Sequence, residues 1–146
     1  MTYPVSVKLL DSRAKVPTYG SADAAGADIY ALTDGPVEIA PGQTVVIHTG
    51  VAFAIPKGYV GLVHARSGMA TKQGLAPANK VGVVDADYRG EVMVALHNHS
   101  KEPQIIAHGE RIAQLVILPF LAASFVEAES LADTVRGAGG FGSTGK

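Results

Sequence analysis

Residues 34–64 read DGPVEIAPGQTVVIHTGVAFAIPKGYVGLVH, and this stretch decides the fold class. Four short segments in it are rich in β-branched and aromatic residues, namely Val37–Ile39, Thr44–Ile47, Val51–Ile55 and Tyr59–His64. Turn-forming residues separate these segments at Asp34-Gly35-Pro36, Pro41-Gly42 and Pro56-Lys57-Gly58. Short strands at such regular spacing predict an all-β sandwich or barrel.

The rest of the chain continues this pattern. Further strands are expected at Val5–Leu10, Asp28–Tyr30, Glu91–His97, Gln104–Ala107 and Gln114–Leu118. No window of about a dozen residues shows a sustained helical period. One short helix is expected over Ser67–Lys72, with Arg66 or Ser67 near its N-cap. There is no internal repeat and no sign of a second globular domain.

The composition narrows the class of protein. The chain has 146 residues and a mass of 15.0 kDa, enough for one domain with a real core. Lys and Arg number 12 and Asp and Glu 13, so the formal net charge is −1, which argues against nucleic-acid binding through bulk positive charge. The lack of cysteine excludes disulfide scaffolds, cysteine nucleophiles, iron–sulfur clusters and the zinc nucleotide deaminases.

No segment is predicted to enter a membrane. The N-terminus, Met1–Ser6, lacks the basic and apolar regions of a signal peptide. The longest apolar run, Leu115–Ala123, includes Pro119 and is far shorter than the roughly 20 residues that span a bilayer. We therefore expect a soluble cytoplasmic protein with neither a membrane nor a nucleic-acid partner.

The C-terminal residues differ in composition from the rest. Residues 127–135 are polar and mixed, and residues 136–145 read RGAGGFGSTG, in which five of ten are glycine. So many glycines support neither a strand nor a helix interior. The segment is either a mobile arm or an arm that becomes ordered on a ligand.

The arm contains a G-x-G-x-x-G pattern, but neither common glycine-rich phosphate loop fits it. Only four residues follow Gly142, so no helix can open as in a dinucleotide-binding fold, and Ser143 stands where a P-loop requires lysine. Glycine amides with Arg136, Ser143 and Thr144 still provide donors suited to an anion. Phe141 is placed to stack on a flat ring.

Two carboxylates, Asp85 and Asp87, lie in the run GVVDADYRGE. On a strand they would share one face, where one would act as a general base or metal partner. Alternatively, both cap the end of a strand at residues 88–90. A calcium loop is excluded because Arg89 and Leu96 stand where it requires carboxylates.

Two further groups have both a functional and a structural interpretation. The run Arg66-Ser67-Gly68 before the expected helix suits an anion, or it simply caps that helix. His97 and His99 would share one strand face at a spacing that metals use, but no third ligand is identifiable nearby. A half-exposed strand end is the favoured interpretation of the two histidines.

Five stretches together resemble, in order and spacing, the motifs of the homotrimeric all-β dUTP pyrophosphatase (dUTPase) family. They are Ala25–Ile29, Arg66–Ala70, Asn79–Gly82 with Asp85–Gly90, Gly109–Leu115, and Arg136–Gly137 with Phe141–Gly145. Three departures are Ala65 for a usual proline, Met69 for a common leucine and Glu110 for a common aspartate. None of the three is assigned to chemistry, although Ala65 bears on how the chain enters the Arg66 loop.

The resemblance implies a jelly-roll-like distorted β-barrel subunit with one short helix. It implies a barrel domain over residues 1–126 and a glycine-rich C-terminal arm over residues 127–146. It further implies a homotrimer with three active sites at subunit boundaries, where the arm of one subunit closes over a neighbour's site. This agrees with the arm that the composition suggests.

The implied reaction is hydrolysis of dUTP to dUMP and pyrophosphate, with Mg²⁺ as cofactor and water attacking the α-phosphorus. This reaction keeps uracil out of DNA and supplies dUMP for thymidylate synthesis. By motif position, Asp85 is the general base, and Asp28 holds the water shell of an ion bound mainly by the triphosphate. The implied substrate-binding residues are Arg66, Ser67, Gly68 and Gln114 at the phosphates, Asn79, Gly82, Tyr88 and Met93 at the uracil and deoxyribose, and Arg136, Phe141, Gly142, Ser143 and Thr144 in the closing arm.

Three alternatives remain open at this point. A dCTP deaminase is a structural cousin that uses a different acid–base residue, and the run Asp85–Tyr88 fits it less well. A nucleotide-binding regulator would bind dUTP and contact partner proteins. A purely structural jelly-roll subunit would have no reason to carry an arm suited to phosphate.

Overall fold

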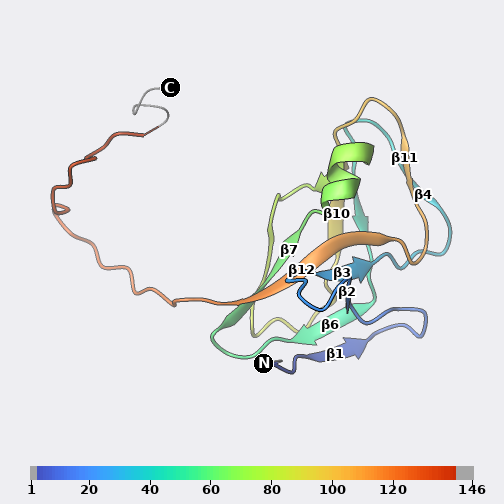
Figure 1. Cartoon of the computed structure of the whole chain (residues 1–146), viewed down its shortest axis with the longest axis horizontal. Helices are drawn as coiled ribbons and strands as arrows, with labels where there is room; N and C mark the ends of the chain where they lie inside the picture. Colours follow the sequence, from blue (N-terminus) through green and yellow to red (C-terminus); the bar gives the residue numbers. More distant parts are fainter. Residues whose placement is uncertain (1–2, 141–146) are drawn as a thin grey trace.

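The structure is a computed structural model, and it describes residues 3–140. These residues form twelve short strands and one helical turn that wrap around a single core as a jelly-roll-like distorted barrel (Figure 1). The all-β prediction is confirmed. In chain order the elements are β1 (Ser6–Leu9), β2 (Thr18–Tyr19), β3 (Ala27–Tyr30), β4 (Val37–Ile39), β5 (Thr44–Ile47), β6 (Val51–Ala54), β7 (Tyr59–His64), the helix η1 (Met69–Gln73), β8 (Leu75–Pro77), β9 (Gly82–Val84), β10 (Val94–Asn98), β11 (Gln104–Ile106) and β12 (Arg111–Pro119).

The largest sheet has the strand order β2-β3-β12-β7-β9, with every pair antiparallel. On the long strand β12, Leu115 lies opposite Val63 of β7, and both side chains are buried in the core. The next residue, Gln114, lies opposite both His64 and Asp28. Because side chains alternate along a strand, these three residues lie on the face away from the core.

Smaller sheets complete the barrel: β5-β10-β8, β11-β4 and β1-β6. Their inward side chains are mostly branched aliphatics, whose burial contributes about 1.5–3 kcal/mol each. The fully buried ones of the whole barrel include Ile29, Ile39, Ile47, Leu75, Leu96, Ile106 and Ile112. Asn98, the one buried side-chain amide among residues 3–140, donates to the carbonyls of Ile39 and Glu102, both at 2.8 Å, and so ties β10 to β4.

Each of the nine expected strands has a counterpart. Val37–Ile39, Thr44–Ile47 and Tyr59–His64 match β4, β5 and β7 residue for residue. The sequence did not predict β2, β8 or β9, which have only two or three residues each. Strands this short form because they hydrogen-bond to a longer neighbouring strand, as β8 does to β10. The local sequence does not reveal such a partner.

The expectation that Asp85 and Asp87 share a strand face is wrong. β9 ends at Val84, where its ladder with β7 stops at Gly61. The amide of Tyr88 then donates to the carbonyl of Asp85 at 3.1 Å, which turns the chain. The two aspartates therefore lie on a turn, where strand alternation does not apply.

The helix differs in detail from its prediction. Ser67 and Gly68 are already helical and lead into the wider turn η1 at Met69–Gln73, and Gly68 makes no side-chain cap. The first helical bond runs from the Ala70 amide to the carbonyl of Arg66, so Arg66 lies at the N-cap as expected. The helix ends at Gly74, whose φ of 68° is left-handed and whose position leaves no room for a Cβ beside Ser100.

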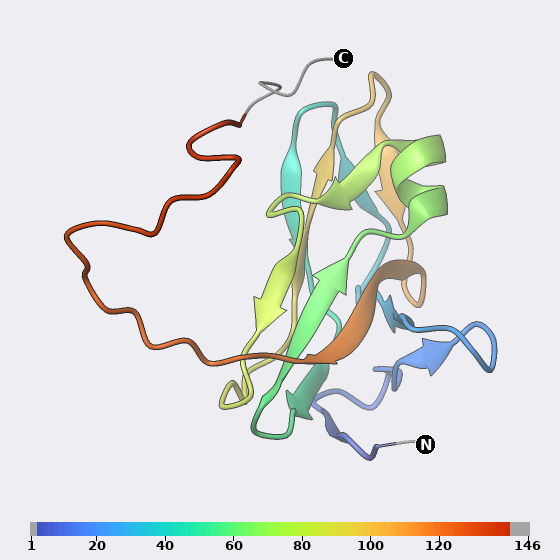
Figure 2. The same ribbon diagram turned by 60° about the vertical axis from the view of Figure 1, so that its left-hand side comes forward.

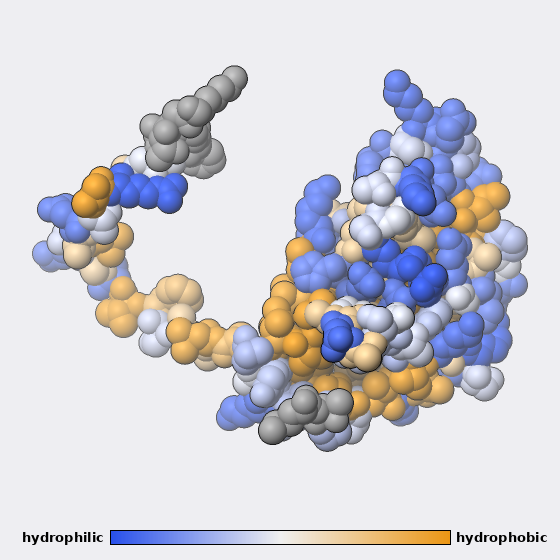
Figure 3. Space-filling model, viewed as in Figure 1, coloured by the Kyte–Doolittle hydropathy of each residue, from blue (hydrophilic) through white to orange (hydrophobic). Residues whose placement is uncertain are grey.

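The chain leaves the barrel at the end of β12. The amide of Phe120 donates to the carbonyl of Gly58 at 3.0 Å, and residues 121–140 then run away from the barrel without strand or helix (Figure 2). Leu121 and Phe125 are 90% and 97% exposed. Figure 3 shows this apolar stretch standing clear of the barrel surface. No helix within residues 3–140 is long and apolar enough to cross a membrane.

Candidate functional site

A buried carboxylate on β3, that of Asp28, joins three segments that are distant in sequence. Its side chain is 4% exposed. Its Oδ1 accepts from Arg66 Nε at 2.9 Å, just after β7, and from Gln114 Nε2 at 3.3 Å on β12. The structure thus brings together three residues that the sequence analysis placed in one site.

The sequence analysis missed a fourth member of this cluster, Arg111. Its Nη1 donates to Asp28 Oδ2 at 3.1 Å, and its side chain is about half exposed. Only its position inside the stretch Gly109–Leu115 hinted at this role. Two guanidiniums around one carboxylate leave one positive charge in excess, which suits an anionic ligand. We call Asp28, Arg66, Arg111 and Gln114 the charged cluster.

The helical turn begins beside the charged cluster. The amide of Ala70 donates to the carbonyl of Arg66 at 2.9 Å, which is the first bond of the turn. The amides of Ser67 and Gly68 precede that bond and so have no partner within the helix. Both residues stand where the sequence analysis expected donors to phosphate.

A cavity of about 290 Å³ lies beside β9, close to the lower end of the size range of small-molecule sites. Residues from β9, β10 and the loop between them form most of its wall. All the residues assigned to base and sugar contacts, together with the assigned base, line it: Asn79, Gly82, Asp85, Tyr88 and Met93. A Cβ at Gly82 would stand 3.3 Å from Asn79 Nδ2 and from Val63 Cβ, so glycine lets the Asn79 amide approach the strand.

The ring of Tyr88 is held by two neighbours that the sequence analysis did not single out. Its Oη donates to the carbonyl of Glu91 at 2.9 Å. A Cβ at Gly90 would lie 2.6 Å from Tyr88 Cζ, so only glycine lets the ring fold back there. In the run DYRG (residues 87–90), the lack of a side chain at Gly90 therefore determines where the ring of Tyr88 lies.

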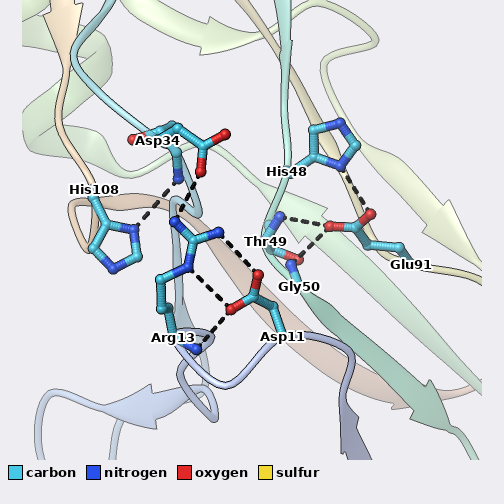
Figure 4. A network of polar contacts seen from close by, with 9 residues as sticks. Asp11, Arg13, Asp34, His48, Thr49, Gly50, Glu91 and His108 are labelled. Carbon is cyan, nitrogen blue, oxygen red and sulfur yellow. Dashed lines mark hydrogen bonds and ion pairs between the residues drawn. The ribbon is translucent and has the colours of Figure 1, made fainter.

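The carboxylate of Glu91 accepts three hydrogen bonds from the turn between β5 and β6 (Figure 4). The donors are the amides of Thr49 and Gly50, at 3.0 and 2.7 Å, while His48 Nδ1 lies 2.9 Å from Oε2. Partial burial raises the pKa of Glu91, but the bonds from His48 and the two amides outweigh burial and hold the pKa below its usual value.

A second polar group lies near that turn. Arg13 pairs with Asp11 at 2.9 Å and with the exposed Asp34 at 2.8 Å (Figure 4). The hydrogen bonds from Arg13 lower the pKa of Asp11 to about 2. No residue assigned to the site belongs to this group, so it is a surface network.

The charged cluster and the cavity lie on different sides of the largest sheet. Asp28 and Gln114 project from the face away from the core. The cavity is lined by Val63 and Gly82, a cross-strand pair on the core side of β7 and β9. None of the four residues of the charged cluster lines the cavity.

The structure leaves the arm residues apart from both regions. Arg136 Nε donates to the carbonyl of Gly139, its own neighbour, at 2.9 Å, and its side chain is exposed. Phe141, Gly142, Ser143 and Thr144 lie outside the described residues. Their expected part in binding stays a prediction.

The protein offers few ligands of its own to a metal. Among residues 3–140 no three His, Cys, Asp or Glu side chains gather as a metal site. The rings of His97 and His99 stack with centroids 6.5 Å apart, and His97 Nδ1 is bonded to Thr44 Oγ1 at 2.9 Å. Asp28 is the carboxylate of the charged cluster, and three donors occupy three of its roughly four acceptor positions.

The fold and these two regions define an all-β domain that carries a cavity beside β9 and a separate charged cluster. The family model of dUTPase matches residues 12–145, and the chain belongs to the dUTPase family. A deoxyuridine 5'-triphosphate nucleotidohydrolase of Desulfitobacterium hafniense is 51% identical over 136 residues, covering 92% of this chain and 90% of the relative.

Solved structures agree with this assignment. The Staphylococcus bacteriophage 80alpha dUTPase with dUpNHpp superposes with a TM-score of 0.87 at 32% identity, covering 99% of this chain and 100% of the other. A dUTPase variant from phage phi11 of S. aureus, with a structural Mg(II) ion, gives 0.79 at 28% identity, covering 88% and 98%. The jelly-roll-like fold expected from the resemblance is confirmed.

Proposed function

We propose that this chain hydrolyses dUTP to dUMP and pyrophosphate, by attack of water at the α-phosphorus. The observation that carries the proposal is the match of the dUTPase family model to residues 12–145. The relatives of this chain are named deoxyuridine 5'-triphosphate nucleotidohydrolase. The separate cavity and charged cluster suit the two halves of such a substrate, a pyrimidine nucleoside and a triphosphate.

Asp85 is the proposed general base. It is the first residue after β9 and lines both the cavity and a second, more open hollow of about 630 Å³. No donor among the described residues reaches its carboxylate, which is therefore free to accept a proton from water. A positioned base of this kind contributes about 10²- to 10⁴-fold in rate.

The proposed phosphate contacts come from the charged cluster and the adjoining turn. Asp28 fixes Arg66 through Nε, which leaves the Nη2 end of that guanidinium for a phosphate oxygen. Ser67 and Gly68 add backbone amides, and Gln114 adds a side-chain amide from β12. Donors fixed before the substrate arrives lose little entropy when they bind it.

The cavity is the proposed site of the uracil and the deoxyribose. The Asn79 amide and the backbone of β9 present both donors and acceptors to the edge of the base. A base whose edge carries a different pattern of donors and acceptors leaves these protein groups unpaired and is rejected. Tyr88 packs under the deoxyribose, where its ring leaves no room for a 2'-hydroxyl. Met93 adds an apolar wall.

A complete site is proposed to form only between subunits of a homotrimer. One chain holds its cavity and its charged cluster on different faces of a sheet, so the triphosphate of a nucleotide in the cavity needs the cluster of another chain. The exposed apolar residues beyond β12, such as Leu121 and Phe125, likewise require a cover. A neighbouring subunit supplies it, and the arm with Arg136 and Phe141 then closes over the nucleotide.

Magnesium is proposed to arrive with the triphosphate. Asp28 retains about one acceptor position, which fits a water of the ion's shell better than direct coordination. When bound, Mg²⁺ neutralises phosphate charge that would otherwise repel Asp85. The phi11 dUTPase variant with its structural Mg(II) ion is consistent with a magnesium-binding family.

The test is chromatography of nucleotides after the purified protein is incubated with Mg²⁺ and either dUTP, dCTP, dTTP or UTP. Selective conversion of dUTP to dUMP and pyrophosphate is expected. Formation of dUTP from dCTP would show the deaminase instead. Binding of dUTP without turnover would favour the regulator.

A further inference from the structure

We propose that Glu91 is a positioning residue for the proposed reaction: it fixes the loop of residues 85–90, and through Tyr88 it sets the preference for deoxyribose. The inference rests on the proposed function and extends it to a residue outside the chemistry.

Five hydrogen bonds attach Glu91 and Val92 to the turn between β5 and β6 and to the first residue of β6. Three are the bonds from His48, Thr49 and Gly50 to the Glu91 carboxylate (Figure 4). In the other two, Thr49 Oγ1 donates to the carbonyl of Val92, and the Val92 amide donates to the carbonyl of Val51 at 2.9 Å. Thr49 itself is 1% exposed, so the anchor is part of the barrel wall.

The loop between β9 and Glu91 has few other attachments to the barrel. Its hydrogen bonds are mostly internal, from Tyr88 to Asp85 and from Arg89 Nη1 to the carbonyls of Ala86 and Tyr88. The loop is therefore held mainly at its ends, by the β9 ladder before Asp85 and by the Glu91 anchor after Gly90. A shift of Glu91 therefore moves the end of the loop that carries Tyr88 and Gly90, whereas Ala86, nearer β9, packs against the core.

Such a shift changes the position of Tyr88 directly. Its Oη bonds to the carbonyl of Glu91, and its ring rests on Gly90, so the position of the ring follows the backbone at residues 90–91. Glu91 also lines the cavity, and the three donors from the β5–β6 turn occupy three of the roughly four acceptor positions of its carboxylate. These bonds hold the carboxylate at the turn, and its proposed role is to act through Tyr88.

The experiment compares Glu91→Ala with Glu91→Gln, and uses Glu38→Ala as a matched control. Glutamine keeps an oxygen for the Thr49 and Gly50 amides and presents an NH₂ to His48 Nδ1. Glu38 is an exposed glutamate on β4. The readouts are kcat and KM for dUTP and UTP, the affinity for the dUTP analogue dUpNHpp by calorimetry, and the melting temperature.

We expect Glu91→Ala to lower kcat/KM for dUTP by about 10- to 100-fold and to narrow the preference for dUTP over UTP, because a displacement of about 1 Å is that costly. Glu91→Gln is expected to stay within about 3-fold of wild type, since hydrogen bonds in the same geometry survive. Glu38→Ala should change nothing.

A folded Glu91→Ala protein with the wild-type dUTP/UTP ratio would overturn the inference, as would a Glu91→Gln protein as impaired as Glu91→Ala. If Glu91→Ala fails to fold, Glu91→Asp decides, because its carboxylate is one methylene too short to reach the turn. Wild-type protein that binds dUpNHpp but does not hydrolyse dUTP would refute the proposed function alone. The dUpNHpp affinities of the variants would then still test the anchor.

Discussion

Replacing Asp28 by asparagine tests whether the charged cluster is held by a buried ionic contact. Asparagine keeps the shape and one acceptor oxygen, which still serves Arg66 Nε and Gln114 Nε2. Its NH₂ group, however, faces Arg111 Nη1, so two donors meet at the position of the present 3.1 Å contact. The substitution therefore removes one hydrogen bond and the negative charge together.

The expected cost follows from the exposure of each partner. Arg111 is 51% exposed and turns out to water, so its lost bond costs at most about 1 kcal/mol. Arg66 is 24% exposed, and its bond falls from a charge-assisted to an ordinary one, which costs about 1 kcal/mol more. The sum of about 2 kcal/mol corresponds to a drop in Tm of about 4–8 °C for a chain of this size.

The assay is scanning calorimetry at one fixed protein concentration, because oligomerisation would make Tm depend on concentration. Asp34→Asn is the matched control. Asp34 also pairs with an arginine, Arg13, but its side chain is 94% exposed, so its replacement should leave Tm nearly unchanged. Equal Tm losses in the two variants, or none in Asp28→Asn, would refute the argument from burial.

Three further outcomes are expected. Asp85→Asn should keep its affinity for dUTP while kcat falls by at least about 10²-fold, and an unchanged kcat would remove Asp85 as the base. Removal of the residues after Val135 should leave a folded protein with poor turnover, whereas a normal kcat and KM would show that the arm is dispensable. Because the pKa of Glu91 is lowered in the folded state, its ionised form stabilises the fold above its usual pKa of 4.5, and this stabilisation is lost as the pH falls through the folded value. The urea midpoints of wild type and Glu91→Gln should therefore differ most above about pH 5 and converge in more acidic buffer.

Much of the barrel could be predicted because its signals are local. In Val37–Ile39, Thr44–Ile47 and Tyr59–His64 the β-branched residues and the flanking Pro-Gly turns act over a few residues, and the strands match residue for residue. The prediction failed where the presence or the end of a strand depends on its pairing with another strand. β8 and β9 exist because β10 and β7 offer them ladders, and Asp85 leaves its strand where such a ladder ends.

The candidate site divides in the same way. The sequence by itself determined which residue types were present and in what order: a carboxylate before a turn, an Arg-Ser-Gly run, a glutamine on a late strand and a glycine-rich tail. Only the tertiary structure decided that Asp28 lies between Arg66 and Arg111, that Gly90 receives the ring of Tyr88, and that Glu91 is fixed to a turn some forty residues earlier in the chain. It also decided that the charged cluster and the cavity lie on different faces of one sheet. The physical reason is that chain propensities act between near neighbours, whereas hydrogen bonds across a barrel depend on strand register, which the packing of the whole core sets.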